Sequence, residues 1–473
     1  MADHEFKPFI LDLPNEVLTE ILDRFARIGE PTKPILFVCR RFYQLGIPVH
    51  YKRLKLSSSE HVSRPKPRLV ELQRTLQKEP GLGEYCRDLC ICSNDANDSD
   101  SNDRNSGENH HGWDDGDWSD GNSDDMDVDE DNADDMDVDE DNADDSDPDY
   151  NPDKFPILQN IASYLTNVHS LEIYGGLGMD EDGGSYSVKN RDTWCLFRSF
   201  VARMPSLRTV SLRGRMHGQL DVRELMDTLK GTSVRRLILH GFEFAPIHQW
   251  TPQHSLIRFK EFGPSCINEL DLELHPETPT ATACLLEWPE TLTSLTFKSN
   301  CSGQKDMDLP RLGSMLRKHK DSLVKLSIGP LAKEGMGKLF DFSAFGAMEE
   351  LELVMQQIVP NWPAKFGEED YSSLLPPNLR ILKVGISGSG NDNYAHFDGR
   401  AGSWLRGYAK TAVRQKVPLR EIVIDAPVLS SKPSRSIAML LWGRLDAPEF
   451  DQYWGGIEAL EKDLWSMGIA LTY

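Results

Sequence analysis

Three aspartates of the 473-residue sequence have the spacing of a calcium loop. Asp127, Asp129 and Asp131 would supply the carboxylates at the first, third and fifth positions of such a loop. The sixth position, where a sharp turn requires glycine, is Asn132, and the twelfth, where a bidentate glutamate is required, is Val138. The spacing therefore does not predict a calcium site.

Three cysteines lie close together in the sequence and could offer thiolate ligands. Cys86, Cys90 and Cys92 are not followed by a second pair of cysteines or histidines at the spacing of a zinc site. On a strand, Cys90 and Cys92 share one face, opposite Leu89 and Ile91. Side-chain packing on a strand is the interpretation that this pattern favours.

Two further motifs have residue types that occur in binding sites. His110 and His111 lie among aspartates, where nothing fixes a coordination geometry. Gly385, Gly388 and Gly390 follow an expected strand, but no helix start or other part of a dinucleotide-binding fingerprint follows them. The sequence also lacks a P-loop, a zincin motif, a nucleophile elbow and paired catalytic carboxylates. It therefore predicts no catalytic residue, no metal site and no cofactor.

The first fifty residues have the pattern of two amphipathic helices. Pro14 stands where a first helical turn tolerates a missing N–H group, and Gly29 supplies the end of this helix. Thr32 can cap a second helix, which we expect to end before Gly46 and Pro48. Apolar residues follow one face of each helix, at Val17, Leu18, Ile21, Leu22, Phe25 and Ile28, then at Ile35, Leu36, Val38, Cys39, Phe42 and Leu45.

Residues 13–22 (LPNEVLTEIL), 38–45 (VCRRFYQL) and 48–56 (PVHYKRLKL) together resemble the F-box of fungal-type F-box proteins. The sequence departs from the family pattern in its short linker, residues 29–33, and in Pro34 at the entry of the second helix. In that family the exposed side of the helices packs into a Skp-type adaptor, which tethers a cullin-RING ligase. The resemblance implies that the adaptor contact is formed or braced by Leu13, Pro14, Val17, Leu18, Ile21, Leu36, Val38, Cys39, Phe42 and Tyr43. The alternative is that these residues only form the core of a small helical hairpin.

A hexapeptide with apolar residues at its first, fourth and sixth positions recurs nine times after residue 160. Its fourth positions advance by 25 to 40 residues, somewhat longer than typical leucine-rich repeats. The copies are Val168-Leu171-Ile173, Leu207-Val210-Leu212, Val234-Leu237-Leu239, Ile267-Leu270-Leu272, Leu292-Leu295-Phe297, Leu323-Leu326-Ile328, Met348-Leu351-Leu353, Leu379-Leu382-Val384 and Leu419-Ile422-Ile424. Two earlier copies are expected at Tyr51-Leu54-Leu56 and Tyr85-Leu89-Ile91, with helically spaced leucines between them.

These patterns predict an α/β protein, in which a helical F-box precedes a leucine-rich-repeat solenoid. We expect an F-box over residues 8–52, first repeats over 53–92, a disordered acidic insert over 93–153, the main repeat array over 154–450 and a capping helix over 451–473. An ordinary α/β domain with parallel strands is the alternative, but its strands would not share one hexapeptide phase.

In such an array each buried strand residue alternates with one that faces solvent, and the solvent-facing side chains form the functional surface. Their charges are of both signs, so no charge class of partner is implied. The candidates for contact with a protein target are Tyr174, Arg213, Arg236, His240, Lys298, Lys325 and Lys383.

The charge of the chain is concentrated in one segment. Residues 93–153 contain 26 Asp and Glu and only one basic residue, so the net charge of this segment is −25. Because the whole chain has a net charge of −23, the other residues together have a net charge of +2. This segment contains a duplicated decapeptide, 126–135 and 136–145, and too few apolar residues to order it. The near-neutral remainder does not indicate nucleic acid or an anionic membrane as a partner.

The sequence favours a substrate-recognition subunit of an SCF-type (Skp-cullin-F-box) ubiquitin ligase, without catalytic activity of its own. No signal peptide or membrane helix is evident, and the eight cysteines do not form a disulfide framework, so we expect a cytoplasmic or nuclear location. The alternative function is a leucine-rich-repeat scaffold that acts without a ligase and uses its acidic segment to bind basic proteins.

Overall fold

The computed structural model describes residues 9–28, 33–57, 67–92, 156–175, 188–244, 265–274, 279–299, 307–329, 331, 340–354, 366–385, 399–425 and 447–473. Several sequence-based expectations lie outside these residues. They are the acidic insert with its calcium-like spacing and histidine pair, the caps at Gly29 and Thr32, and most of the glycine motif after Gly385.

Four short helices form the N-terminal part of the chain, and α1 and α3 pack against each other. They are η1 (Phe9–Asp12), α1 (Asn15–Ile28), α2 (Lys33–Leu36) and α3 (Arg40–Lys52). Helix α1 begins directly after Pro14, whose carbonyl accepts a hydrogen bond from the Leu18 N–H at 3.1 Å. This confirms the expected helix start.

The prediction of one continuous second helix is wrong. Cys39 has an extended backbone, with φ −160° and ψ 166°, and its sulfur accepts a hydrogen bond from the Phe42 N–H, so it caps α3 instead of continuing α2. Helix α3 also runs past Gly46 and Pro48 to Lys52. A proline inside a helix removes one backbone donor, and its ring crowds the carbonyl four residues earlier. At Gly46 a Cβ atom would lie 2.1 Å from the Leu36 side chain, so α2 and α3 are in close contact there. Packing against α2 therefore stabilises a helix that local propensity would end.

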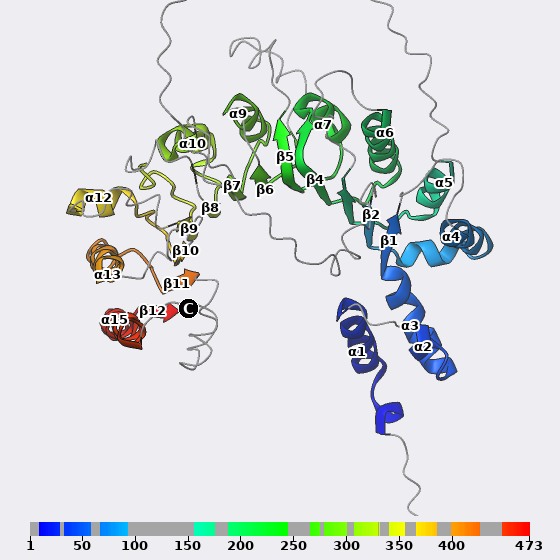
Figure 1. Ribbon diagram of the computed structural model, residues 1–473, viewed down its shortest axis with the longest axis horizontal. Coiled ribbons are helices and arrows are strands. Elements are labelled where there is room, and N and C mark those ends of the chain that lie inside the picture. Colours follow the sequence, from blue (N-terminus) through cyan, green and yellow to red (C-terminus); the bar gives the residue numbers. More distant parts are fainter. Residues whose placement is uncertain are drawn as a thin grey trace, which may run out of the picture. The chain divides into compact units, whose positions relative to one another are not determined.

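The described strands form one parallel sheet of twelve strands, in which every strand pairs with its neighbours in sequence order (Figure 1). They are β1 (Arg53–Ser57), β2 (Asp88–Cys92), β3 (Ser170–Tyr174), β4 (Thr209–Leu220), β5 (Arg236–Phe244), β6 (Glu269–Leu274), β7 (Ser294–Ser299), β8 (Lys325–Ile328), β9 (Glu350–Val354), β10 (Ile381–Gly385), β11 (Glu421–Asp425) and β12 (Ala470–Thr472). A doubly wound domain would reverse its strand order, so the sequential order identifies a solenoid.

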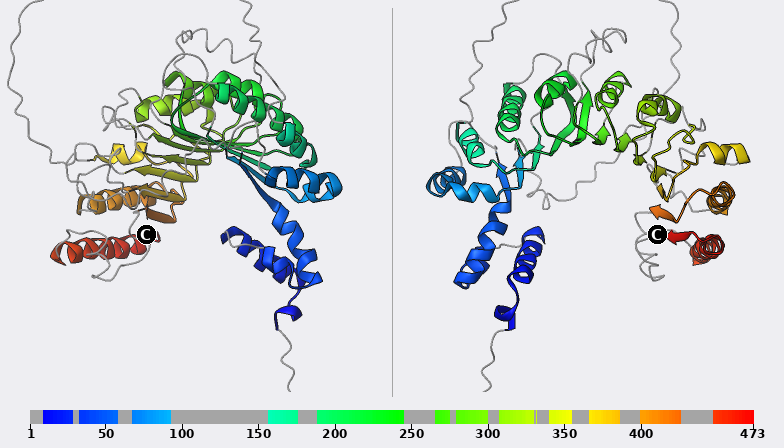
Figure 2. Two further views of the ribbon diagram at one scale, coloured as in Figure 1. Left: turned by 45° about the vertical axis from the view of Figure 1, so that its right-hand side comes forward. Right: turned by 180° about the vertical axis from the view of Figure 1, so that it is seen from behind.

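The described helices that connect or follow the strands lie on one face of the sheet (Figure 2). They are α4 (Pro67–Lys78), η2 (Pro80–Tyr85), α5 (Pro156–Tyr164), α6 (Val188–Arg203), α7 (Val222–Leu229), α9 (Pro279–Glu287), α10 (Leu309–Leu316), η6 (Arg317–His319), α12 (Glu368–Ser373), α13 (Gly399–Arg414) and α15 (Ala447–Ser466). We call the side of the sheet on which none of these described helices lies the helix-free face. None of the described helices is long and apolar enough to cross a membrane.

The repeated hexapeptide forms the core of the solenoid, as expected. All apolar residues of the nine predicted copies are at most 6% exposed and belong to one continuous cluster, which extends from Leu56 to Ile469. Register explains this continuity, because Leu171 pairs with Leu89 on one side and with Val210 on the other. The same positions thus stack from strand to strand.

The two earlier copies form β1 and β2, although the phase predicted for the second copy is wrong at its first position. Tyr85 is 42% exposed, whereas Cys86 is fully buried. Cys86 stands three residues before Leu89, which is the spacing of the other copies. At the other end of the chain, the segment expected as a capping helix contains α15 and also β12, which pairs with β11.

Candidate functional site

The N-terminal helices have a small core of their own, separate from that of the solenoid. Leu18 and Leu22 on α1 pack with Phe42 and Val49 on α3. Arg41 also links the two helices, because its guanidinium group donates to the Asn15 side chain at 2.7 Å and 2.9 Å and to a backbone carbonyl at 2.6 Å. We call α1, α2 and α3 together the N-terminal hairpin.

The hairpin leaves much of its apolar surface uncovered. Of the eleven exposed large apolar side chains among the described residues, six lie within the first 43 positions. The most exposed of these six are Phe37 at 80% and Val38 at 66%, and both lie in the turn between α2 and α3. The other four are Ile10, Val17, Phe25 and Tyr43.

The apolar stripe of α1 is wider than the surface that α3 covers. Leu18 and Leu22 face α3 and are buried, whereas Val17 and Phe25, eight residues apart, remain about 40% exposed. Ile21 lies between them on the same side of the helix and is half-buried. One half of the stripe thus belongs to the core, and the other half faces outward.

The ten residues implied in adaptor contact divide into three groups. Leu18, Leu36 and Phe42 are buried inside the hairpin, so they can only brace a contact. Leu13, Ile21 and Cys39 are half-buried. The four that are accessible are Pro14, Val17, Val38 and Tyr43.

Two accessible apolar residues of the hairpin were not among these ten. Phe25 belongs to the α1 stripe and could have been included from its spacing alone. Phe37 is exposed because the chain turns between α2 and α3, and a single continuous helix does not predict that turn. The turn ends at Cys39, whose sulfur caps α3. Cysteine is not among the residues that commonly cap helices, so the sequence gives little indication of this helix start.

The residues predicted to contact a target all lie on the helix-free face of the sheet. They alternate with buried residues along their strands, as shown by Tyr174 beside Ile173 and His240 beside Leu239. The seven residues are Tyr174, Arg213, Arg236, His240, Lys298, Lys325 and Lys383, and they come from six different strands, β3, β4, β5, β7, β8 and β10.

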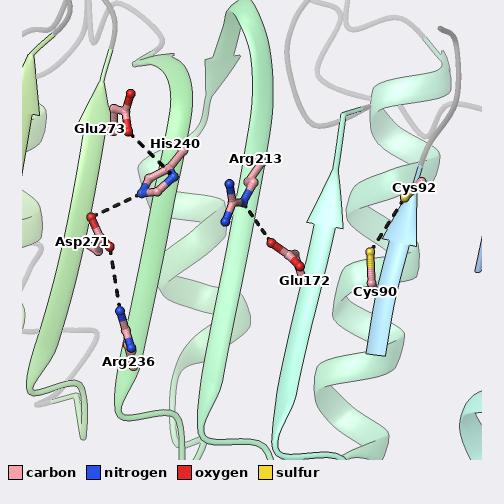
Figure 3. Close-up of polar contacts among 8 residues, drawn as sticks. All are labelled: Cys90, Cys92, Glu172, Arg213, Arg236, His240, Asp271 and Glu273. Atoms are coloured by element: carbon pink, nitrogen blue, oxygen red, sulfur yellow. Dashed lines mark hydrogen bonds and ion pairs between the residues drawn. The ribbon is translucent and has the colours of Figure 1, made fainter. Parts of the chain in front are cut away.

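Five of these seven residues contact an acidic residue of a neighbouring strand, and three of the five are drawn in Figure 3. The Arg213 Nε lies 2.9 Å from a Glu172 carboxylate oxygen, and the Arg213 guanidinium carbon lies 5.4 Å from the centre of the Tyr174 ring. Burial, together with the hydrogen bond to Glu172, raises the pKa of Tyr174 to about 12. The phenol is therefore neutral at physiological pH, and it can donate a hydrogen bond to this carboxylate.

A second group of paired charges joins β5 and β6. The His240 Nε2 lies 3.3 Å from an Asp271 oxygen, and the Arg236 guanidinium lies 3.9 Å from the other Asp271 oxygen and 3.8 Å from Glu269 (Figure 3 shows the Asp271 contacts). Burial alone would raise the pKa of Asp271, but the hydrogen bond and charge of His240, with the charge of Arg236, hold it below its usual value. This carboxylate is ionised and paired.

A third group joins β8, β9 and β10. The ammonium groups of Lys325 and Lys383 lie 3.1 Å and 2.6 Å from the same oxygen of Glu350. Burial would raise the pKa of Glu350, but the two lysines lower it overall. Since charges of the helix-free face compensate one another across strands, a partner does not meet a field of one sign there.

Cys90 and Cys92 lie at the N-terminal end of the sheet, on the helix-free face of β2. Their sulfur atoms are 3.8 Å apart, and both side chains are half-buried (Figure 3). Burial, with the thiol of Cys92 beside it, raises the pKa of Cys90 to about 12. The expectation that these cysteines share one strand face opposite Leu89 and Ile91 is confirmed.

In the part of the chain that the structure describes, no group of three or more His, Cys, Asp or Glu side chains is placed to hold a metal ion. His240 and Asp271 form a pair of the kind found in general-base catalysis. The pair has no described serine, threonine or cysteine nucleophile hydrogen-bonded to it, and it belongs to the charge network of the sheet. The two surfaces, hairpin and helix-free face, are therefore the candidates for function.

No family model matches the chain, and no curated protein matches it in sequence. Among solved structures, the chain is similar to one described as the crystal structure of the Rad7 and Elc1 complex in yeast. That similarity has 12% sequence identity and a TM-score of 0.34, and it covers 89% of this chain and 91% of the other.

Proposed function

We propose that the chain is an F-box substrate receptor of an SCF-type ubiquitin ligase. The F-box expected over residues 8–52, which contains the N-terminal hairpin, binds a Skp-type adaptor, and the helix-free face of the repeat sheet binds the protein to be ubiquitinated. The receptor contributes no catalytic group. It raises the local concentration of its target near the ubiquitin-charged enzyme that the cullin-RING part of the complex holds.

The observation that carries this proposal is the exposed apolar surface of the hairpin. Its buried apolar side chains are only five, the four of the small core and Leu36. Five large apolar side chains of the hairpin remain exposed, and Ile10 on η1 is exposed as well. Exposed apolar groups that gather in one part of a soluble protein mark a surface for another protein. The sequence resemblance to the F-box supports a Skp-type adaptor as the protein that covers them.

The role of the sheet rests on its accessible polar surface. Side chains from many repeats lie in register on one face, as in repeat proteins that bind partners over an extended area. Because their charges are largely paired within the chain, we expect a target to be recognised by shape and by local hydrogen bonds. A single substitution of a paired residue such as Arg213 should then have only a small effect on the affinity for the target. Loss of the hairpin should have a larger effect on the affinity for the adaptor.

Adaptor binding tests the proposal directly. The full-length chain and the double variant Phe37→Ala with Val38→Ala are titrated with a purified Skp-type adaptor, and the dissociation constants are measured by calorimetry. These two side chains are largely exposed, so their removal should leave the hairpin folded. We expect binding at least about 10-fold weaker, which corresponds to about 1.4 kcal/mol.

Trp465→Ala is the matched control. Trp465 is 76% exposed but lies on α15, outside the hairpin, so its removal should leave the affinity unchanged. Equal binding by the wild type and the double variant would contradict the proposed surface. A wild-type chain that does not bind the adaptor at all would instead favour the scaffold alternative. That function would then be tested by comparing the affinity for a basic protein of the full-length chain and of a variant without residues 95–150.

A further inference from the structure

Two cysteines of β2 are positioned as a pair by the geometry of a strand. Successive side chains of a strand point to opposite faces, so Cys90 and Cys92, two residues apart, emerge side by side. Leu89 and Ile91 hold the strand in place by burial on the helix side. The two thiols therefore lie side by side without any contribution from a loop.

The two sulfur atoms lie at hydrogen-bond distance from each other, and the same separation suits two ligands of a shared ion. The sulfurs are 3.8 Å apart, whereas a disulfide requires about 2.0 Å. In a tetrahedral zinc site with zinc–sulfur bonds of about 2.3 Å, two ligand sulfurs are separated by about 3.8 Å. The thiol pair thus has the spacing of two ligands of a tetrahedral ion, with no movement of the backbone.

The pair is accessible and lies between charges of both signs. Glu172, which is paired with Arg213, is the register partner of Cys90 on β3, and Lys55 is its register partner on β1. Both cysteines are half-exposed on the helix-free face. Cys86, by contrast, precedes β2, is fully buried in the core of the solenoid and donates towards the Asp88 carbonyl.

We propose that Cys90 and Cys92 form a two-thiolate site for a thiophilic divalent cation of the Zn²⁺ and Cd²⁺ class. Two S–H bonds break, two metal–sulfur bonds form, two protons pass to solvent and the ion loses two of its waters, with no change of oxidation state. The remaining two positions of the ion stay open to water or to a ligand from a protein bound on this face. This site does not depend on the ligase function.

Cadmium is a suitable probe, because thiolate ligands give it a charge-transfer absorption in the ultraviolet that carboxylates and imidazoles do not give. The full-length reduced chain is titrated with Cd²⁺, and the absorption and the protons released are measured together. We expect one site with two protons released for each ion bound. Metal bound by the acidic segment or by its histidines does not add to the absorption.

The variants separate the pair from the other cysteines. Cys90→Ser and Cys92→Ser should each weaken binding at least about 10-fold, and the double variant should lose the absorption of this site. Cys266→Ser, which changes an exposed cysteine elsewhere in the chain, should have no effect. Cys90→Val and Cys92→Val, which suit a strand, should reproduce the loss in a chain whose folding is verified by circular dichroism.

Two results would overturn the site. One is an unchanged absorption in the double serine and double valine variants. The other is a wild-type chain that binds Cd²⁺ without thiolate absorption. Adaptor affinity, measured on the same variants, should remain at the wild-type value, so failure of this site and failure of the proposed function are distinguishable.

Discussion

His319 connects two consecutive repeats, and its replacement should have a large and dissectible effect on stability. The side chain is 1% exposed. Its Nε2–H donates to the Leu286 carbonyl at 2.8 Å, and its Nδ1 accepts from the Leu292 N–H at 3.3 Å. Leu286 belongs to α9 and Leu292 begins the approach to β7, so the ring fixes the turn that joins them.

The expected cost follows from the two backbone groups that the ring satisfies. A buried polar group left without its partner costs about 1–3 kcal/mol. His319→Ala orphans both groups and should lower the free energy of unfolding by roughly 2–6 kcal/mol, with a further loss from the cavity. In His319→Asn the amide oxygen can replace Nδ1 as acceptor, so only the Leu286 carbonyl loses its partner and the loss should be about 1–3 kcal/mol.

Urea unfolding followed by tryptophan fluorescence measures these losses, and hydrogen exchange of the Leu292 amide localises them. This amide should exchange faster in His319→Ala than in His319→Asn. Lys318→Ala is the neighbouring control, because Lys318 is partly exposed and bonds to the carbonyls of Glu287 and Pro289 at the surface. Equal losses for the alanine and asparagine variants, or a loss for His319→Ala no larger than that of the control, would refute this account.

Three further predictions concern pH, a shared ion pair and a close contact. Because burial lowers the pKa of His319, the unfolded chain takes up this proton first. Stability should therefore be full above about pH 6.5 and fall as the pH drops below it, by at most about 1.4 kcal/mol per unit. Urea titrations at several pH values should show this component in the wild type and not in His319→Asn. Glu350→Gln removes the carboxylate that two lysines share and should cost about 1 kcal/mol, less at high salt, in urea titrations with and without added salt. In Gly83→Ala the new Cβ would lie 2.2 Å from the Tyr164 carbonyl oxygen, so thermal unfolding should show a loss of about 1–3 kcal/mol; an unchanged midpoint would contradict the contact.

The sequence predicted the solenoid well, because one physical requirement repeats along it. A strand that is buried on one side needs apolar residues two apart, and the shared phase of Val168, Leu171 and Ile173 recurs in eight more hexapeptides. The same alternation placed the target-face candidates, such as Tyr174 and His240, on the side opposite the core. The periodicity of apolar residues is sufficient to predict which side of each strand faces the core, without knowledge of contacts between distant residues.

The features that the sequence did not reveal depend on packing between elements. The break before Cys39 and the continuation of α3 through Pro48 depend on how α2 packs against Gly46. The sharing of Glu350 by two lysines depends on the register of three strands that are distant in sequence. The sequence shows that Cys90 and Cys92 are two residues apart, but it does not show the distance between their sulfur atoms.

The pairing of β2 with β3 has a consequence for how the chain can be divided. Asp88 pairs with Ser170 and Cys92 with Tyr174 in unbroken register, although 77 residues separate the two strands. A cut between residues 93 and 155 would leave every strand of the sheet intact and would remove only the covalent connection. We expect fragments 1–95 and 150–473, produced together, to assemble into a two-piece protein. Such a protein would permit the piece with the N-terminal hairpin to be exchanged or labelled without altering the larger part of the repeat array.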